Sequence, residues 1–203
     1  MRPAKIVSVD VSESDGEAVA VPSQSQTEEI EAIPENLFRE PIDYLFADHY
    51  RQRIICKHLD QIAFDPGTDQ VARLAELALD YLDRDLPLHI ADEEQDLFPR
   101  LRVRCGPEDR IEDILTQLSE EHARCQEMGL YLSAGLRRLA EGRPSTQEDA
   151  FLEAASTFAE NQRRHFGLEE RVTLPLARKR LLPSDLEELG RSMAARRGAA
   201  YPE

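Results

Sequence analysis

Apolar residues recur at helical spacing through most of the chain after Pro41. The stripe over 42–59 predicts a first helix that begins at Pro41 and ends at the turn 65–67. A second stripe starts at 68 or 69 and predicts another helix. Pro87 should kink or break this second helix, because proline lacks the backbone N–H that a helix interior needs.

The helical pattern continues to the end of the chain. Apolar spacing resumes over 89–101, so we expect the second helix to continue past the proline at a changed angle. A third helix is expected over 108–141, with Gly142 as its stop. A fourth helix should open with a capping box and cover 145–180. A short fifth helix should begin at 184 and stop before Gly198.

These elements predict an all-α fold. No strand pattern stands out after Pro41, and long amphipathic helices joined by short turns favour an up-down-up-down four-helix bundle. Residues 1–36 are rich in Ser, Glu, Val and Gln without a sustained period, which predicts an acidic, mostly disordered arm. We therefore expect an arm at 1–36, the bundle at 37–182, and a short C-terminal helix and tail at 183–203.

Composition narrows the class of protein. With 203 residues and 41% hydrophobic content, the chain can bury one substantial core. Its formal net charge of −15 argues against nucleic acid or an anionic membrane surface as a partner. There is neither a membrane-spanning apolar run nor a secretory signal pattern, so a cytoplasmic protein is expected. The three cysteines form no Cys-x-x-Cys pair, which argues against a disulfide framework.

Two segments carry the same polar side chains in the same frame. Four positions of the first segment recur 76 residues later: His89 and His165, Glu93 and Glu169, Glu94 and Glu170, Pro99 and Pro175. A His and a Glu four residues apart lie on one helix face, about 6 Å apart along the axis. Two such helices bring two imidazoles and two carboxylates into a core, and a pair of metal ions is the usual reason to bury that set.

Two single histidines extend this repeat. His49 lies 40 residues before His89, and His122 lies 43 residues before His165, each on the preceding expected helix. Four of the five histidines in the chain are thus placed by one pattern, which points to a site. The fifth, His58, follows His49 by nine residues and falls on the opposite side of that helix, so we expect it at the surface or rim.

With these residues identified, the chain resembles the hemerythrin-like HHE cation-binding domain family over about 41–182. The resemblance implies a non-haem centre of two irons, bridged by carboxylates and by an oxo or hydroxo group. It also implies a role for each matched residue. By position, one iron would be bound by His49 and His89, the other by His122 and His165, and both by Glu93 and Glu169.

The sequence departs from the oxygen-carrying hemerythrins of this family. Those proteins have a second His four positions after the third-helix His, where this chain has Gln126. Because Gln126 lies one turn after His122, we expect it to face the same metal. The oxygen carriers also have a longer spacing between His and Asp on the last helix, whereas Glu169 follows His165 by only four residues. Fewer His ligands leave each metal an open position, a composition closer to carboxylate-bridged oxidase or sensor centres than to an oxygen carrier.

Several neighbouring side chains receive simpler interpretations. Glu94 and Glu170 are rotated about 100° from the proposed ligands, so we expect them beside the site or at the surface. Cys56 and Cys125 are expected to pack in the core. Three arginines near the end of the chain are expected to be solvated: Arg191, Arg196 and Arg197.

The resulting functional hypothesis is a protein with two irons that responds to or reacts with dioxygen, nitric oxide or peroxide, as a sensor or in redox or iron homeostasis. Two alternatives from other classes stay open: a helical interaction module with an unidentified protein partner, and an iron store or donor without redox chemistry of its own. His and Glu also bind manganese and zinc, so the residue types alone do not identify the metal.

Overall fold

The computed structural model describes residues 30–143 and 148–203, and every regular element within these ranges is helical. The predicted all-α fold class is therefore confirmed for this part of the chain. The elements are η1 (Glu35–Arg39), α1 (Pro41–Phe64), α2 (Val71–Asp80), η2 (Tyr81–Asp85), α3 (Leu86–Asp92), η3 (Glu93–Leu97), α4 (Phe98–Arg104), η4 (Pro107–Asp109), α5 (Ile111–Ala140), α6 (Glu148–Arg171), α7 (Thr173–Arg180) and α8 (Pro183–Arg196). Most of the expected arm, 1–29, and the start of the expected capping box, 145–147, lie outside the described residues.

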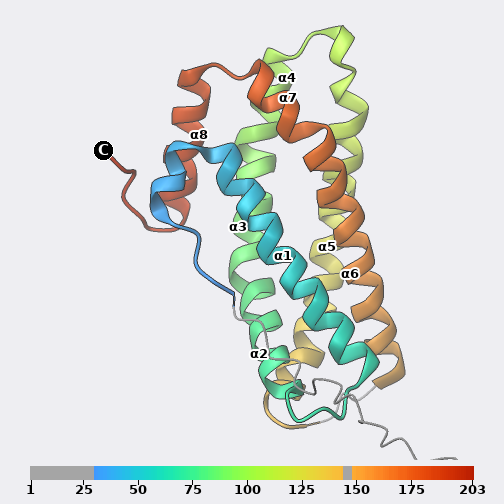
Figure 1. The fold of residues 1–203 in the computed structure, drawn as a ribbon. Helices are drawn as coiled ribbons and strands as arrows, with labels where there is room; N and C mark the ends of the chain where they lie inside the picture. The colour runs from blue at the N-terminus through green and yellow to red at the C-terminus, as the bar shows by residue number, and fades with distance from the viewer. Residues whose placement is uncertain (1–29, 144–147) are drawn as a thin grey trace, which may run out of the picture.

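The long helices lie alongside one another (Figure 1). Helix α1 packs on α2 and α6, and α5 packs on the same two helices, while α4 lies beside α5 and α7. Helix α8 turns back and contacts η1, α1 and α3. Within the described ranges, no helix combines the length and apolar character that a bilayer crossing needs.

The hydrophobic interior is divided into two clusters with a polar layer between them. Along α1, Leu45 belongs to one cluster and Ile55 to the other, and His49 lies between them. The order is reversed along α6 and α7. Phe166 belongs to the cluster of Ile55, Leu174 belongs to the cluster of Leu45, and Glu169 lies between Phe166 and Leu174. Helices α1 and α5 thus cross the polar layer within their length, and α6 reaches it near its C-terminal end. Apolar packing on both sides of the layer fixes the position of the polar side chains.

The segments α2, η2, α3, η3 and α4 follow one another without a gap and form one helical column, which changes its helix type just before each of its two prolines. The sequence predicts a kink or break at Pro87, and the structure instead accommodates Pro87 and Pro99 by two π-helical segments, η2 and η3, immediately upstream. A wider turn, in which Leu86 N–H donates to the carbonyl of Tyr81 five residues earlier, relieves the demand for the hydrogen bond that proline cannot make. The second such segment begins at Glu93, one of the proposed metal ligands.

The fourth expected helix is also interrupted by its proline. The sequence predicts one helix over 145–180, but the structure divides it into α6 and α7 at Val172, where φ is −126° and ψ is −65°. Pro175 lacks an N–H and its ring would clash with the carbonyl of Arg171, so a regular helix cannot continue. The hydroxyl of Thr173 donates to the carbonyl of Glu169 at 3.1 Å and stabilises this junction.

Helix α8 is anchored to the column that carries Glu93 by two of the three arginines that were expected to be solvated, Arg196 and Arg197, whereas Arg191 is exposed as expected. Arg196 and Arg197 each place a guanidinium nitrogen 2.7 Å from the fully buried carboxylate of Asp92. Arg196 also pairs with Asp96. The sequence pattern showed three arginines in a polar stretch, but not that a buried aspartate lies against two of them.

This anchoring gives a stability prediction. Arg197→Ala should lower the free energy of unfolding by about 3 kcal/mol, because Asp92 would stay buried with only Arg196 as its cationic partner. The measurement is urea unfolding followed by circular dichroism. Arg191→Ala is the matched control: Arg191 makes an exposed pair with Glu187 on the same helix, so its loss should change stability by less than about 1 kcal/mol. Equal effects of the two substitutions would contradict the anchoring role.

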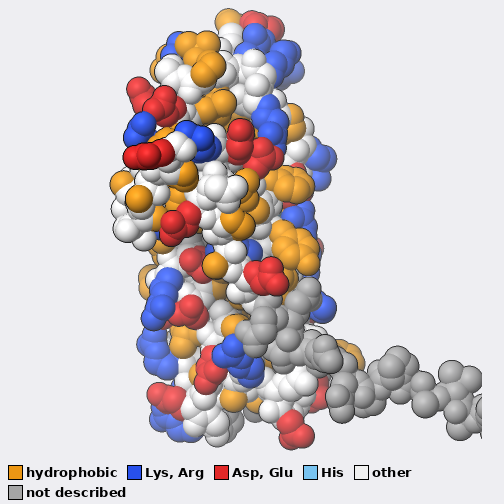
Figure 2. Space-filling model, turned by 60° about the vertical axis from the view of Figure 1, so that its left-hand side comes forward, with side chains coloured by type: hydrophobic (Ala, Val, Ile, Leu, Met, Phe, Trp, Pro, Cys, Tyr) orange, Lys and Arg blue, Asp and Glu red, His pale blue; other side chains and the backbone are white. Residues whose placement is uncertain are grey.

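The surface on the side where α8 lies is mixed in charge. Basic and acidic side chains are interspersed there, with hydrophobic side chains in small groups between them (Figure 2). Ion pairs of this kind join different helices, for example Arg178 with Asp43 at 2.6 Å. Exposed pairs of this type contribute little stability individually.

Candidate metal centre

The structure brings all six predicted ligand residues together in the polar layer. Every one of them is buried, and they come from four parts of the chain: His49 on α1, His89 on α3 with Glu93 at the start of η3, His122 on α5, and His165 and Glu169 on α6. They form two groups of four that share both glutamates. Within each group the candidate ligand atoms all lie within 4.8 Å of one another.

The inward-facing atoms are the Nε2 atoms of the histidines and the carboxylate oxygens of the two glutamates. Four contacts join them at 3.2–3.4 Å: His49 Nε2 with Glu169 Oε2, His165 Nε2 with Glu169 Oε1, His89 Nε2 with Glu93 Oε2, and His122 Nε2 with Glu93 Oε2. Each glutamate therefore lies between two histidines. The Nε2 atoms of His122 and His165 are themselves 2.9 Å apart.

A second ring of carboxylates contacts the outer nitrogen of every histidine. The Nδ1 distances are 3.1 Å from His89 to Asp48, 2.6 Å from His122 to Glu94, 2.8 Å from His165 to Glu121, and 3.2 Å from His49 to Glu170. A carboxylate that accepts from Nδ1–H fixes the ring and leaves the Nε2 lone pair facing inward, which is the usual arrangement around metal-binding histidines.

Sequence reasoning found only half of this outer ring. Glu94 and Glu170 were expected beside the site, and the structure places both there, whereas Asp48 and Glu121 were missed. The signal was present, because an acidic residue directly precedes each single histidine. Asp48 on α1 contacts His89 on α3, however, and Glu121 on α5 contacts His165 on α6. The periodicity of one helix does not show such contacts between helices.

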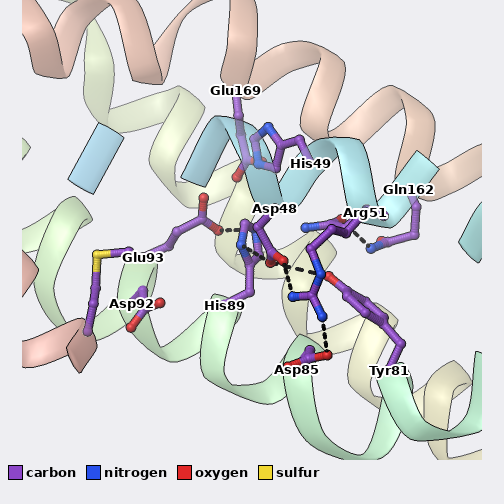
Figure 3. A network of polar contacts seen from close by, with 12 residues as sticks. Asp48, His49, Arg51, Tyr81, Asp85, His89, Asp92, Glu93, Gln162 and Glu169 are labelled. Atoms are coloured by element: carbon purple, nitrogen blue, oxygen red, sulfur yellow. Dashed lines mark hydrogen bonds and ion pairs between the residues drawn. The ribbon is translucent and has the colours of Figure 1, made fainter. Parts of the chain in front are cut away.

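Asp48 connects the site to a buried polar network. Its carboxylate lies against His89, accepts a hydrogen bond from Arg51 at 2.9 Å, and accepts another from the hydroxyl of Tyr81 at 3.3 Å. Arg51 also donates to Asp85 at 2.7 Å. Figure 3 shows this chain of contacts on the side of His89 that faces away from Glu93. The network holds the imidazole of His89 from outside the site.

Most of the inward-facing atoms of the six residues have no hydrogen bond with one another, and bound metal ions would satisfy them. Within the described residues, six inward atoms are buried without a partner in hydrogen-bond geometry: Nε2 of His49 and His89, and both oxygens of Glu93 and of Glu169. Burying polar atoms in this state is costly, and bound cations would satisfy them. Neutral imidazole and carboxylate are ligands for iron, manganese and zinc.

Protons compete for these positions. Burial opposes the charged form of His49, but the neighbouring carboxylates of Glu169 and Glu170 prevail and raise the pKa of its imidazole to about 10. The pKa of His122 is likewise raised to about 10, because the neighbouring carboxylates of Glu93 and Glu94 outweigh burial. The metal-free protein therefore holds charged imidazoles at neutral pH, and a metal ion must displace their protons.

This competition predicts proton release on metal binding. At pH 7.5, adding metal ions to the metal-free protein should release at least the two protons held by His49 and His122. Each ion displaces one of these protons, so the apparent affinity for each ion should rise about tenfold per pH unit until the pH passes about 10. A pH indicator in weakly buffered solution measures the release, and the release of less than one proton per chain would contradict the inward role of these imidazoles.

Two other sequence expectations need correction. His58 is only 1% exposed rather than at the rim, because α1 packs against other helices on more than one side. Gln126, at the position where the oxygen carriers have an additional His, is exposed and does not join the buried groups. The expectation that Cys56 and Cys125 are core residues is confirmed, since both are buried among apolar side chains.

Comparison with known proteins agrees with this geometry. The hemerythrin HHE cation binding domain matches residues 40–177, which contain every residue of the two His/Glu groups. An uncharacterized protein of Haemophilus influenzae is 30% identical over 164 residues, which cover 79% of this chain and 91% of that protein. The resemblance inferred from the sequence is thus confirmed, and the chain belongs to the hemerythrin HHE cation-binding domain family.

Proposed function

We propose that this protein is a non-haem di-iron protein that responds to or reacts with dioxygen, nitric oxide or peroxide. The observation that carries the proposal is the pair of four-residue groups that share Glu93 and Glu169. Two overlapping donor sets with two common carboxylates suit two adjacent metal ions. A single ion held by one group would leave the two buried histidines of the other group without a metal partner.

The proposed roles follow from the contacts. His49 and His89 would hold one ion, His122 and His165 would hold the other, and Glu93 and Glu169 would each serve as a ligand to both. The outer carboxylates keep the imidazoles oriented, so that metal binding requires little rearrangement. We further propose that the helices form the up-down-up-down four-helix bundle expected from the sequence, with these donors on its axis.

Two bound ferrous ions can together supply two electrons to a small oxidant. The residues of this chain contribute the environment of that reaction. Apolar clusters on both sides of the polar layer limit the access of water. Contact with His122 and His165 lowers the pKa of the Glu94 and Glu121 carboxyls against the effect of burial, so these groups stay charged and hold the imidazoles through their Nδ1 atoms. Each donor set offers two histidines and the two shared glutamates, a set that would leave a bound ion able to accept an external ligand.

Exposure of the ferrous protein to air tests this function. The protein is loaded with ferrous iron without oxygen, and its near-ultraviolet absorption is followed during addition of air and then of argon. We expect absorption to grow and to persist under argon until a reductant is added, because no additional His completes either donor set for reversible binding. Return of the ferrous spectrum under argon alone would favour oxygen carriage. An unchanged spectrum in air and in peroxide would favour an iron store or an interaction module.

A further inference from the structure

A hollow of about 740 Å³ lies along the surface between α5 and α6, which run side by side (Figure 1). Of the six candidate metal ligands, only His165 belongs to its lining. The carboxylate of Glu121 contacts His165 Nδ1 from this side and accepts a hydrogen bond from Gln117 at 2.8 Å. Sites for small organic molecules usually have volumes of about 300–1,000 Å³. The hollow is therefore large enough for a ligand that does not enter the polar layer.

The floor of the hollow is apolar. Phe158 and Cys125 belong to the buried core, and Met128 packs against that core while it remains partly exposed. Leu168, which is also partly exposed, lies ten residues beyond Phe158 on α6, or about 15 Å along the helix axis. An apolar chain laid along this floor would be removed from water, which favours binding.

The charged side chains of the lining have the opposite balance to the whole chain. The protein has 25 basic and 40 acidic residues. The hollow is lined by two glutamates and by four arginines: Arg124, Arg163, Arg164 and Arg171. One of the glutamates, Glu121, already contacts the imidazole of His165 at 2.8 Å. The lining therefore favours an anionic ligand although the protein as a whole repels one.

Two of the four arginines have acidic partners and two do not. Arg124 and Arg163 each form an ion pair with an acidic side chain. Among the residues that the structure describes, neither Arg164 nor Arg171 pairs with a carboxylate, and Arg164 donates instead to the side-chain oxygen of Asn161. Two guanidinium groups at one end of the hollow are thus available to an external acid.

A glycine directs these two arginines toward each other. A guanidinium nitrogen of Arg171 lies 3.2 Å from the position that a Cβ at Gly167 would occupy, so the side chain lies back along α6. Gly167 is three residues from Arg164, or about 5 Å along the axis. Leu168 follows Arg164 by four residues and precedes Arg171 by three, so it shares their face of the helix. Guanidinium groups bind carboxylates by paired hydrogen bonds, and here an apolar side chain lies beside them.

We propose that this hollow binds a small organic acid with an apolar chain. The carboxylate lies between Arg164 and Arg171, and the chain runs from Leu168 toward Met128 and Phe158. The proposal goes beyond the proposed function, because no inward-facing donor atom of the polar layer takes part in it. It assigns the protein a second kind of ligand, recognised by charge at one end and by apolar contact at the other.

Calorimetric titration with decanoate tests the class of ligand. Acetate supplies the same carboxylate without a chain, and decan-1-ol supplies the chain without a charge. We expect decanoate to bind about tenfold more tightly than either, or better, because both parts of the ligand contribute. Equal binding of acetate would indicate an adventitious ion only, and equal binding of decan-1-ol a non-specific apolar surface. Either result would overturn the proposal.

The same titration on iron-loaded and on chelator-depleted protein separates this site from the metal centre. We expect equal affinity for decanoate in both, because the Nε2 atom of His165 contacts Glu169 and not the hollow. Loss of decanoate binding after metal removal would overturn the proposal, since the acid would then be a ligand of the metal. A protein that binds fewer than two ions but still binds decanoate would overturn only the proposed function.

A double variant tests the two arginines. Arg164→Gln combined with Arg171→Gln alters exposed positions and should weaken decanoate binding about tenfold or more, because both charged donors are lost. The matched control is Arg84→Gln combined with Arg191→Gln, which removes the same charge from exposed ion pairs elsewhere and should leave binding unchanged. Equal affinities of the two double variants would overturn the proposal.

Met128→Lys tests the apolar floor independently of net charge. The substitution adds a positive charge while it removes apolar surface, so it should strengthen the binding of a simple anion but weaken that of decanoate. Helicity is measured first, and if this variant does not fold, the arginine variants decide. Equal or tighter decanoate binding by folded Met128→Lys protein would show that the chain does not lie on this floor, and the proposal would be wrong.

Discussion

Replacing Glu169 by alanine should reduce the metal content of the protein from two ions per chain to one or none. Its carboxylate lies 3.2 Å from His49 Nε2 through one oxygen and 3.2 Å from His165 Nε2 through the other, so it belongs to both donor sets. Its removal takes one ligand from each ion and leaves a gap in a fully buried position. Elemental analysis of the purified protein after loading and desalting measures the loss.

One control variant and one second ligand variant separate the loss of a metal ligand from general damage to α6. Glu153→Ala removes an exposed carboxylate from the same helix and should leave the metal content unchanged. Glu93→Ala should reproduce the loss, because Glu93 lies between His89 and His122 as Glu169 lies between its own pair. If Glu169→Ala kept two ions per chain, the shared-carboxylate arrangement would be wrong.

Removing the metal should lower the melting temperature by roughly 15–30 °C. A ligand present at about a thousand times its Kd stabilises the folded state by about 4 kcal/mol, and two ions by about twice that. For a chain of this length, each kcal/mol shifts the midpoint by about 2–4 °C. The physical cause is the buried set of carboxylates and imidazoles, which without metal ions depends on protons for compensating charge.

The measurement is calorimetry of the metal-loaded protein and of protein depleted with a chelator at the same pH. The Glu169→Ala variant serves as the control, since a chelator should shift its midpoint much less than that of the natural sequence. Identical midpoints for the loaded and depleted natural protein would show that metal binding is not coupled to folding at this site.

The sequence was most informative where it repeats. A 76-residue repeat located two His/Glu pairs, and the two preceding histidines completed the buried groups without any knowledge of the fold. Helical periodicity also located the main helices, because apolar stripes with few breaks specify both helix type and extent. The ligand role of these residues remains a prediction, which the metal analyses test.

The residues that the sequence misplaced or missed share one physical cause. A helical pattern gives the direction of a side chain around its own axis, but not how many neighbours cover that direction. His58 points away from His49 and is buried all the same. Asp48 and Glu121 contact histidines on other helices, and Arg197 meets a buried aspartate 105 positions earlier in the chain. Such contacts depend on tertiary packing, which local periodicity does not encode.

The sequence predicted where the helices are interrupted but not what form each interruption takes. Proline marks where a regular helix must change, and both Pro99 and Pro175 follow a proposed bridging glutamate by six residues. Whether the chain responds with a π-helical turn, as before Pro99, or with a break, as before Pro175, depends on the packing around it. The sequence therefore indicated the positions of the interruptions and not their form.

The most direct test of the central claim is elemental analysis of the natural protein purified without oxygen, combined with its absorption spectrum before and after air. The account predicts two iron ions per chain and near-ultraviolet absorption that develops in air. A content of one ion or none after loading, or two ions of a metal that gives no change in air, would contradict it.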